Sequence, residues 1–209
     1  MSVYRIYVEK KPQFAVEAKK VCKDLKTSLQ IDSINSVRVI NRYDVQGLEE
    51  KNYDLASKTV FSEPALDDIY FECPKAANIF AIEYLPGQFD QRADSCAQCI
   101  QLLVQGDRPT VKNARIYIVD GEISKEEFEK IKDYLINPVE SREASLLPVL
   151  TLDTNYEIKT TVKTLDGFID LSKPELKKFI EDYSLAMDFD DIVFCQEYFA
   201  LTEKRNPTI

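Results

Sequence analysis

Residues Leu85–Cys99 read LPGQFDQRADSCAQC and bring acids, an arginine, amides and two thiols together in one short stretch. Such a set could support proton transfer, ion pairing or thiol chemistry. The chain has no histidine, however, which removes Ser-His and Cys-His nucleophile pairs and histidine-bound metals. The stretch therefore has no base whose ordinary pKa lies near neutrality. We expect it to fix a turn or to contact a partner rather than to catalyse a reaction.

The five cysteines do not form a pattern that predicts disulfides or a metal site; they are Cys22, Cys73, Cys96, Cys99 and Cys195. An odd count with scattered spacing argues against a disulfide scaffold. Cys96 and Cys99 form a CxxC pair, but zinc would need a second pair. A redox CxxC usually opens a helix, whereas helical spacing here begins at Asp90. The sequence favours buried or half-buried helix residues, with redox and metal roles as alternatives.

Composition limits the class of protein and its partners. The chain has 209 residues, 44% of them hydrophobic, and a formal net charge of -9. The apolar content supports a sizeable core, and the acidic surface disfavours nucleic acid and anionic lipid as partners. No apolar run approaches the ~18 residues of a membrane span. The N-terminus lacks a signal-peptide core, so the sequence predicts a cytoplasmic protein. No GxGxxG or GxxxxGK[ST] motif is present to cradle phosphates.

The first 145 residues repeat one order of elements. Period-2 and period-3.6 patterning predicts a strand, a helix, a strand and a helix at residues 4–8, 14–29, 36–43 and 48–59, closed by a short strand. The same order returns at residues 79–84, 90–104, 114–119 and 124–135. Ser124 and Glu127 form a capping box at the start of the last helix.

Individual residues of the two copies also align. Three pairs are 74 residues apart: Pro12 and Pro86, Gly47 and Gly121, and Pro64 and Pro138. Arg38-Val39 matches Arg115-Ile116 at a spacing of 77. We therefore predict an α+β fold with two tandem ferredoxin-like split-βαβ lobes, about 1–73 and 74–145, as a pseudo-dimer. Their sheets are expected to face each other or to join along an edge.

Residues 146–209 differ in pattern and are predicted to form a linker domain that is extended at first and then helical. The extended part, through Leu171, has room for one hairpin, and Asp166-Gly167 signals a turn. A capping box at Ser172 begins a helix. A second helix, starting at Asp188 or at Asp190, completes a helical hairpin.

Several long motifs resemble one enzyme family. LPGQFDQRADSCAQCIQLL, VFSEPALD, INPVESREASL and TLDTNYEI resemble the N-terminal signature of large single-chain phosphoribosylformylglycinamidine synthases, also called formylglycinamide ribonucleotide amidotransferases. FCQEYFALTEKRNPTI resembles the segment that leads into the synthetase domain of that family. The resemblance covers essentially the whole chain.

The resemblance implies a cytoplasmic ligase of purine biosynthesis that uses ATP, magnesium and glutamine to make formylglycinamidine ribonucleotide. In that family an N-terminal domain resembles a dimer of a small separate subunit, and a linker, a synthetase domain and a glutaminase with a Cys-His-Glu triad follow. The present sequence matches the N-terminal domain and the linker, and it has neither the histidine of the glutaminase triad nor a segment that resembles the synthetase domain. We therefore expect this chain to be a noncatalytic scaffold and linker, without catalytic residues, bound metal or cofactor. Its expected partners are the synthetase and glutaminase domains of the parent enzyme.

Five residues of the opening stretch are candidates for interdomain contact: Gln88, Asp90, Gln91, Arg92 and Asp94. Asp90 stands where a helix N-cap belongs, and Asp94 favours the positive end of the helix dipole. The plainer alternative is a capped turn with an Asp-Arg pair. A free-standing ferredoxin-like regulatory module that binds a small ligand is the alternative function. A closed polar pocket between the lobes would favour that module, and large exposed apolar patches would favour the scaffold.

Overall fold

The computed structural model describes residues 2–153 and 162–208. It divides into two compact units, Met1–Thr154 and Asn155–Ile209. The first unit is an α+β fold built on a six-stranded antiparallel sheet, and the second is a small helical unit. Residues 154–161 of the extended part that the sequence predicts through Leu171 lie outside the described residues, so its hairpin stays a prediction.

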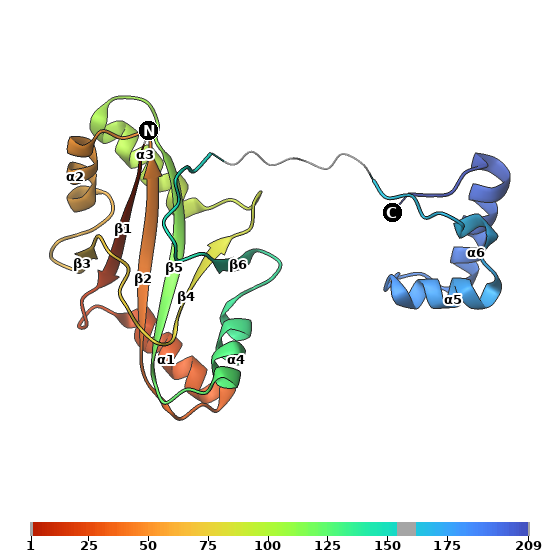
Figure 1. Ribbon diagram of the computed structural model, residues 1–209, viewed down its shortest axis with the longest axis horizontal. Helices are drawn as coiled ribbons and strands as arrows, with labels where there is room; N and C mark the ends of the chain where they lie inside the picture. The colour runs from red at the N-terminus through yellow and green to blue at the C-terminus, as the bar shows by residue number, and fades with distance from the viewer. Residues whose placement is uncertain (1, 154–161, 209) are drawn as a thin grey trace. The chain divides into compact units, whose positions relative to one another are not determined.

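The first unit contains the repeated order of elements that the sequence predicts (Figure 1). Its first half comprises β1 (Val3–Lys10), α1 (Val16–Leu29), β2 (Ile34–Gln46), α2 (Glu50–Thr59) and β3 (Asp67–Tyr70). Its second half comprises β4 (Ile79–Tyr84), α3 (Gln91–Val104), β5 (Thr110–Gly121), α4 (Lys125–Leu135) and β6 (Ser141–Ala144). The capping box of Ser124 and Glu127 is confirmed at the start of α4.

One continuous sheet joins the two halves, with the strand order β3-β1-β2-β5-β4-β6. The central pair is β2 and β5, in which Val39 lies opposite Tyr117 and Ile40 opposite Ile116. Within each half the first strand lies between the other two and is antiparallel to both. Of the two arrangements that the sequence left open, the structure has the edge-joined one.

All four helices of the first unit cover the same face of the sheet. In β2 the residues that face them alternate along the strand, from Val37 and Val39 to Tyr43 and Val45. Helices α1 and α4 pack over one end of the long strands, and α2 and α3 over the other (Figure 1). The helix layer is therefore made of two pairs, which leaves the middle of this face between them.

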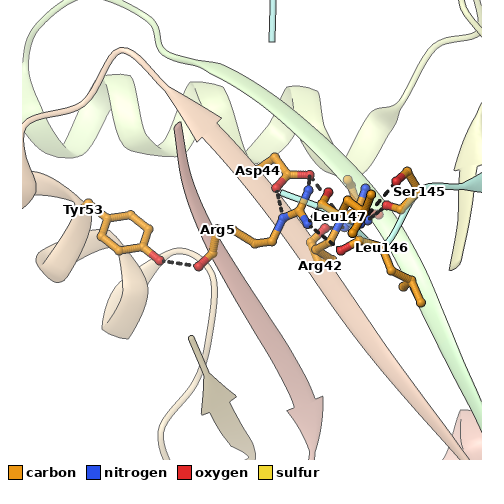
Figure 2. Close-up of polar contacts among 8 residues, drawn as sticks. Arg5, Arg42, Asp44, Tyr53, Ser145, Leu146 and Leu147 are labelled. Carbon is orange, nitrogen blue, oxygen red and sulfur yellow. Dashed lines mark hydrogen bonds and ion pairs between the residues drawn. The ribbon is translucent and has the colours of Figure 1, made fainter. Parts of the chain in front are cut away.

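A buried ion network holds the segment after β6 on the opposite face of the sheet (Figure 2). Arg5 and Arg42 both pair with Asp44, whose side chain is 4% exposed. Arg5 also donates to the carbonyl oxygens of Leu146 and Leu147, at 3.1 and 2.9 Å. Arg42 donates to the carbonyl oxygen of Ser145 at 2.7 Å. These bonds tie residues 145–147 to the first unit.

The predicted strand ends differ from the observed ones because of this network. The sequence ends the second strand at Tyr43, but β2 continues to Gln46. Buried positions of a strand are expected to be apolar, so the charged residues Arg42 and Asp44 indicate the end of a strand. Both are buried, at 4% and 3% exposure, because Asp44 pairs with Arg42 and also with Arg5.

The second unit is a helical hairpin with a short irregular entry. Its elements are η1 (Phe168–Asp170), α5 (Lys173–Asp182), α6 (Phe189–Glu197) and the π-helical turn η2 (Tyr198–Glu203). Phe168, Leu176 and Ile192 form its buried centre. The predicted capping box at Ser172 is confirmed, and the last helix is capped by Asp188 rather than Asp190.

Candidate functional site

The turn between β4 and α3 carries the predicted contact residues. Pro86 and Gly87 form the turn, and the positive φ of 93° at Gly87 suits glycine. Asp90 is the N-cap of α3, because its carboxylate accepts a hydrogen bond of 2.9 Å from the backbone nitrogen of Ala93. Its role as an N-cap is confirmed. Gln88 and Gln91 are exposed beside it.

Asp94 and Arg92 have separate partners. Asp94 forms an ion pair with Arg108 and accepts a hydrogen bond from Gln98 at 2.9 Å. Arg92 instead donates to the hydroxyl of Tyr43, at 3.3 Å. Within residues 2–153 and 162–208, no carboxylate forms an ion pair with Arg92. An Asp-Arg pair therefore exists at this turn, but its arginine comes from the loop after α3.

A polar cleft of about 620 Å³ lies against this turn, on the helix-covered face of the sheet. Its walls come from the first turns of α3, the end of α2 and the segment leading to β3. Its floor comes from β1, β2 and β5. The lining includes Lys10, Asn41, Tyr43, Thr59, Phe61, Ser62, Glu63, Asp67, Tyr84, Asp90, Gln91, Arg92, Ser95, Cys96, Cys99, Asn113 and Arg115. Both halves of the first unit therefore contribute to the cleft.

Two smaller hollows adjoin the cleft. One of about 130 Å³ shares Tyr84, Asn113 and Arg115 with it. Another of about 490 Å³ shares Lys10 and Asn41 with it and passes under the start of α1. The three hollows follow the uncovered middle of the sheet, between the two helix pairs.

Polar residues stand on the floor where the strand pattern would place core residues. Asn41 occupies a helix-facing position of β2 between Val39 and Tyr43, and Asn113 and Arg115 occupy such positions in β5. Asn113 donates to the carbonyl oxygen of Arg42 at 3.0 Å. The Oδ1 atom of Asn41 is buried and accepts no hydrogen bond from any described group. This break in the apolar alternation of β2 and β5 is visible in the sequence and is the one local signal that marks the cleft.

The electrostatics of the cleft centre on two arginines. Burial lowers the pKa of Arg92, but its bond to Tyr43 raises the pKa, and the net shift is upward. The neighbouring charge of Arg115 acts on Arg92 in the opposite direction, because two guanidinium ions repel each other. Arg115 has Glu17 as its acidic partner, with 3.2 Å between Nη1 and Oε1. Both guanidinium groups stay charged at neutral pH.

The CxxC pair lies within α3 and lines the same cleft. Cys96 is 8% exposed, and burial raises the pKa of its thiol to about 11. Cys99 is exposed. A raised thiol pKa makes the nucleophilic thiolate scarce at neutral pH, which disfavours a redox role for the pair. In the part of the chain that the structure describes, no three Cys, Asp or Glu side chains gather as metal ligands would.

The fold and the cleft define an α+β protein with a polar hollow between two helix pairs. Among the described helices, none is long and apolar enough to cross a membrane. No protein-family model matches the chain, and no curated protein matches it.

Proposed function

We propose that this chain is the noncatalytic N-terminal scaffold and linker of an ATP- and glutamine-dependent amidotransferase that makes formylglycinamidine ribonucleotide in purine biosynthesis. The motifs that resemble that family are the starting point. The observation that supports the proposal best is the internal repeat, because the family resemblance implies an N-terminal domain that imitates a dimer of a small subunit.

The arrangement of the strands supports a pseudo-dimer of two ferredoxin-like lobes. The two halves of the sheet have the same order when each is taken from the edge to the centre, β3-β1-β2 in one and β6-β4-β5 in the other. Each strand of the first half thus has a counterpart at the equivalent place in the second half. The halves meet through the counterparts β2 and β5, which are antiparallel, as a local twofold axis requires.

The turn before α3 supports a docking role. Asp90 already caps the helix, so Gln88 and Gln91 are not needed for that purpose. Phe89, between them, is 71% exposed. An exposed aromatic ring flanked by amides and an arginine is typical of the residues that anchor protein interfaces. In this proposal the synthetase and glutaminase domains of the parent enzyme cover the turn, and they alone supply the sites for ATP, magnesium and glutamine.

A complementation experiment tests the scaffold proposal. This chain and a second chain that carries the synthetase and glutaminase domains would be expressed together, and glutamine-dependent formation of the amidine would be measured. We expect activity only when both chains are present. Activity of the second chain alone at the full rate, or failure of the two chains to associate, would contradict the proposal.

A matched pair of variants locates the interface. Phe89→Ser should reduce association of the two chains and the activity that depends on it. Val139→Ser removes an equally exposed side chain, at 77% exposure, before β6 and should change neither. Equal effects of both variants would remove the turn from the interface.

A regulatory module that binds a small ligand is the second candidate function. The polar cleft at the junction of the two halves favours it, since small-molecule sites are concave and carry a few convergent polar groups. The cleft is open rather than closed, and it coexists with exposed apolar side chains such as Phe89 and Leu102.

A further inference from the structure

The cleft contains two arginines whose charges the protein does not strongly neutralise. Arg92 has a tyrosine hydroxyl as its hydrogen-bond partner and no described carboxylate. Arg115 pairs with Glu17, but the two side chains are 41% and 51% exposed. Ion pairs at such exposure contribute little, because water and salt screen them. A ligand anion can therefore compete with Glu17 for Arg115.

Two of the three acids that line the cleft are already engaged elsewhere. Asp67 pairs with Lys10 at 2.8 Å and accepts a hydrogen bond from the backbone nitrogen of Glu63. Asp90 accepts the capping hydrogen bond of α3. Glu63, the third acid, is exposed. The lining has three acids and three cations, Lys10, Arg92 and Arg115. Because Asp67 and Asp90 are engaged elsewhere, positive charge is in local excess at the two arginines.

The start of α3 is not the source of this excess. Asp90 occupies the N-terminal end of the helix and adds a negative charge there. An anion in the cleft would be held by the planar forks of the arginines, which match the oxygens of carboxylates and phosphates. The cleft volume of about 620 Å³ is much larger than a bare phosphate needs and falls within the usual range for organic ligands.

The floor offers groups for the remainder of such a ligand. The buried Oδ1 atom of Asn41 accepts no hydrogen bond from the described protein groups, so a hydroxyl or ammonium group of the ligand could donate to it. Tyr84 lies on the same lining and is 47% exposed. Its ring provides an apolar surface beside the charged groups.

We propose that this cleft binds a small organic anion, whose phosphate or carboxylate group lies between Arg92 and Arg115. Asn41 accepts a hydrogen bond from a hydroxyl or ammonium group of the same ligand. The proposal concerns a site within the first unit and holds whether or not the chain serves as a scaffold. The two proposals can therefore fail separately.

Titration calorimetry on the full chain tests the site with defined probes. The probes are glycerol 3-phosphate, malate and inorganic phosphate, with glycerol as the uncharged control. We expect saturable binding of at least one organic anion with a dissociation constant on the order of 1 mM or lower. Preference between glycerol 3-phosphate and malate identifies phosphate or carboxylate as the preferred group. Absence of saturable binding by all three anions would overturn the proposal.

Matched arginine variants distinguish the site from general attraction of anions. Arg92→Gln and Arg115→Gln should each weaken binding at least ~10-fold, because each removes charge-assisted hydrogen bonds. Arg108→Gln removes an equal charge from the loop after α3, outside the cleft lining, and should leave binding unchanged. Equal weakening by all three variants would show nonspecific attraction and would overturn the site.

The exposed thiol of Cys99 provides an independent readout. Because Cys99 lines the cleft, a bound anion should slow its alkylation by iodoacetamide in the wild-type chain. The protection should require the same anion concentration as the calorimetric signal and should disappear in Arg92→Gln. Unchanged alkylation at saturating anion would place the bound anion elsewhere and contradict the proposal.

Discussion

Removal of Asp44 should destabilise the first unit strongly, because two buried arginines depend on it. The side chains of Asp44, Arg5 and Arg42 are 4%, 11% and 5% exposed. In Asp44→Ala both guanidinium groups lose their counter-ion in a place that water reaches poorly. Breaking a buried pair in this way typically costs ~3–5 kcal/mol of unfolding free energy. We expect a loss in that range.

The carbonyl groups after β6 reduce the loss only in part. Arg5 keeps its bonds to Leu146 and Leu147, and Arg42 keeps its bond to Ser145. These carbonyls satisfy hydrogen-bond donors, but they do not neutralise charge. Since Asp44 also orients both arginines, the variant should loosen the segment from residue 145 to residue 147.

Urea unfolding followed by circular dichroism measures the cost, and hydrogen exchange of residues 145–153 measures the loosening. Asp94→Ala is the control, because its pair with Arg108 is 30% and 42% exposed and should contribute about 1 kcal/mol or less. A loss for Asp44→Ala no larger than that of the control would refute the argument from burial. Unchanged exchange in residues 145–147 would refute the clamping role.

Three further predictions concern single positions of the first unit. Gly121→Ala should cost about 2–4 kcal/mol of unfolding free energy, because φ is +147° and a Cβ would lie 2.1 Å from the backbone oxygen of Ser33. Gly87→Ala should cost about 1 kcal/mol, because φ is +93° but no atom lies within 4 Å of the added Cβ. Equal melting temperatures of the two variants would contradict this difference. The pKa of about 11 for Cys96 predicts that Cys99 is alkylated far faster than Cys96 at pH 8. It also predicts that the buried thiol of Cys96 contributes stability below its ordinary pKa of about 9, and that this stability is lost as the pH rises toward 11. A Cys96→Ala variant whose stability changes with pH between 9 and 11 as the wild type does would count against this. Arg92→Ala should lower the unfolding free energy of the isolated chain by under ~1 kcal/mol, because the side chain is exposed and has one long hydrogen bond. The complemented enzyme with this variant should lose activity. A large loss of chain stability would make Arg92 structural, and normal activity would remove it from the interface.

Local features of the fold follow closely from the sequence. The sequence predicts where three helices begin, with N-caps at Asp90, Ser124 and Ser172. These caps can be predicted because each is a hydrogen bond between residues three positions apart. The strand Ile79–Tyr84 has the bounds that its pattern predicts. The repeat of elements is also readable, since it needs only the order of patterns along the chain.

The sequence did not reveal the partners of charged residues that meet across strands. Asp44 and Arg42 look like the end of a strand, and only the approach of Arg5 from β1 and of the carbonyls after β6 explains their burial. Asp94 likewise pairs with Arg108, fourteen positions away, rather than with Arg92. Such pairs depend on how the chain folds back, which local periodicity does not encode.

The sequence by itself determined the order of the elements and most of their caps, because these depend on neighbours within a few residues, and the return of the same order revealed two similar halves. The tertiary structure decided that β2 and β5 join the halves edge to edge. That pairing places Asn41 beside Arg115 across the central strands, while α3 brings Arg92 to the same hollow. A cleft is a property of surfaces from distant segments, so its chemistry could be read only once the sheet had brought those segments together.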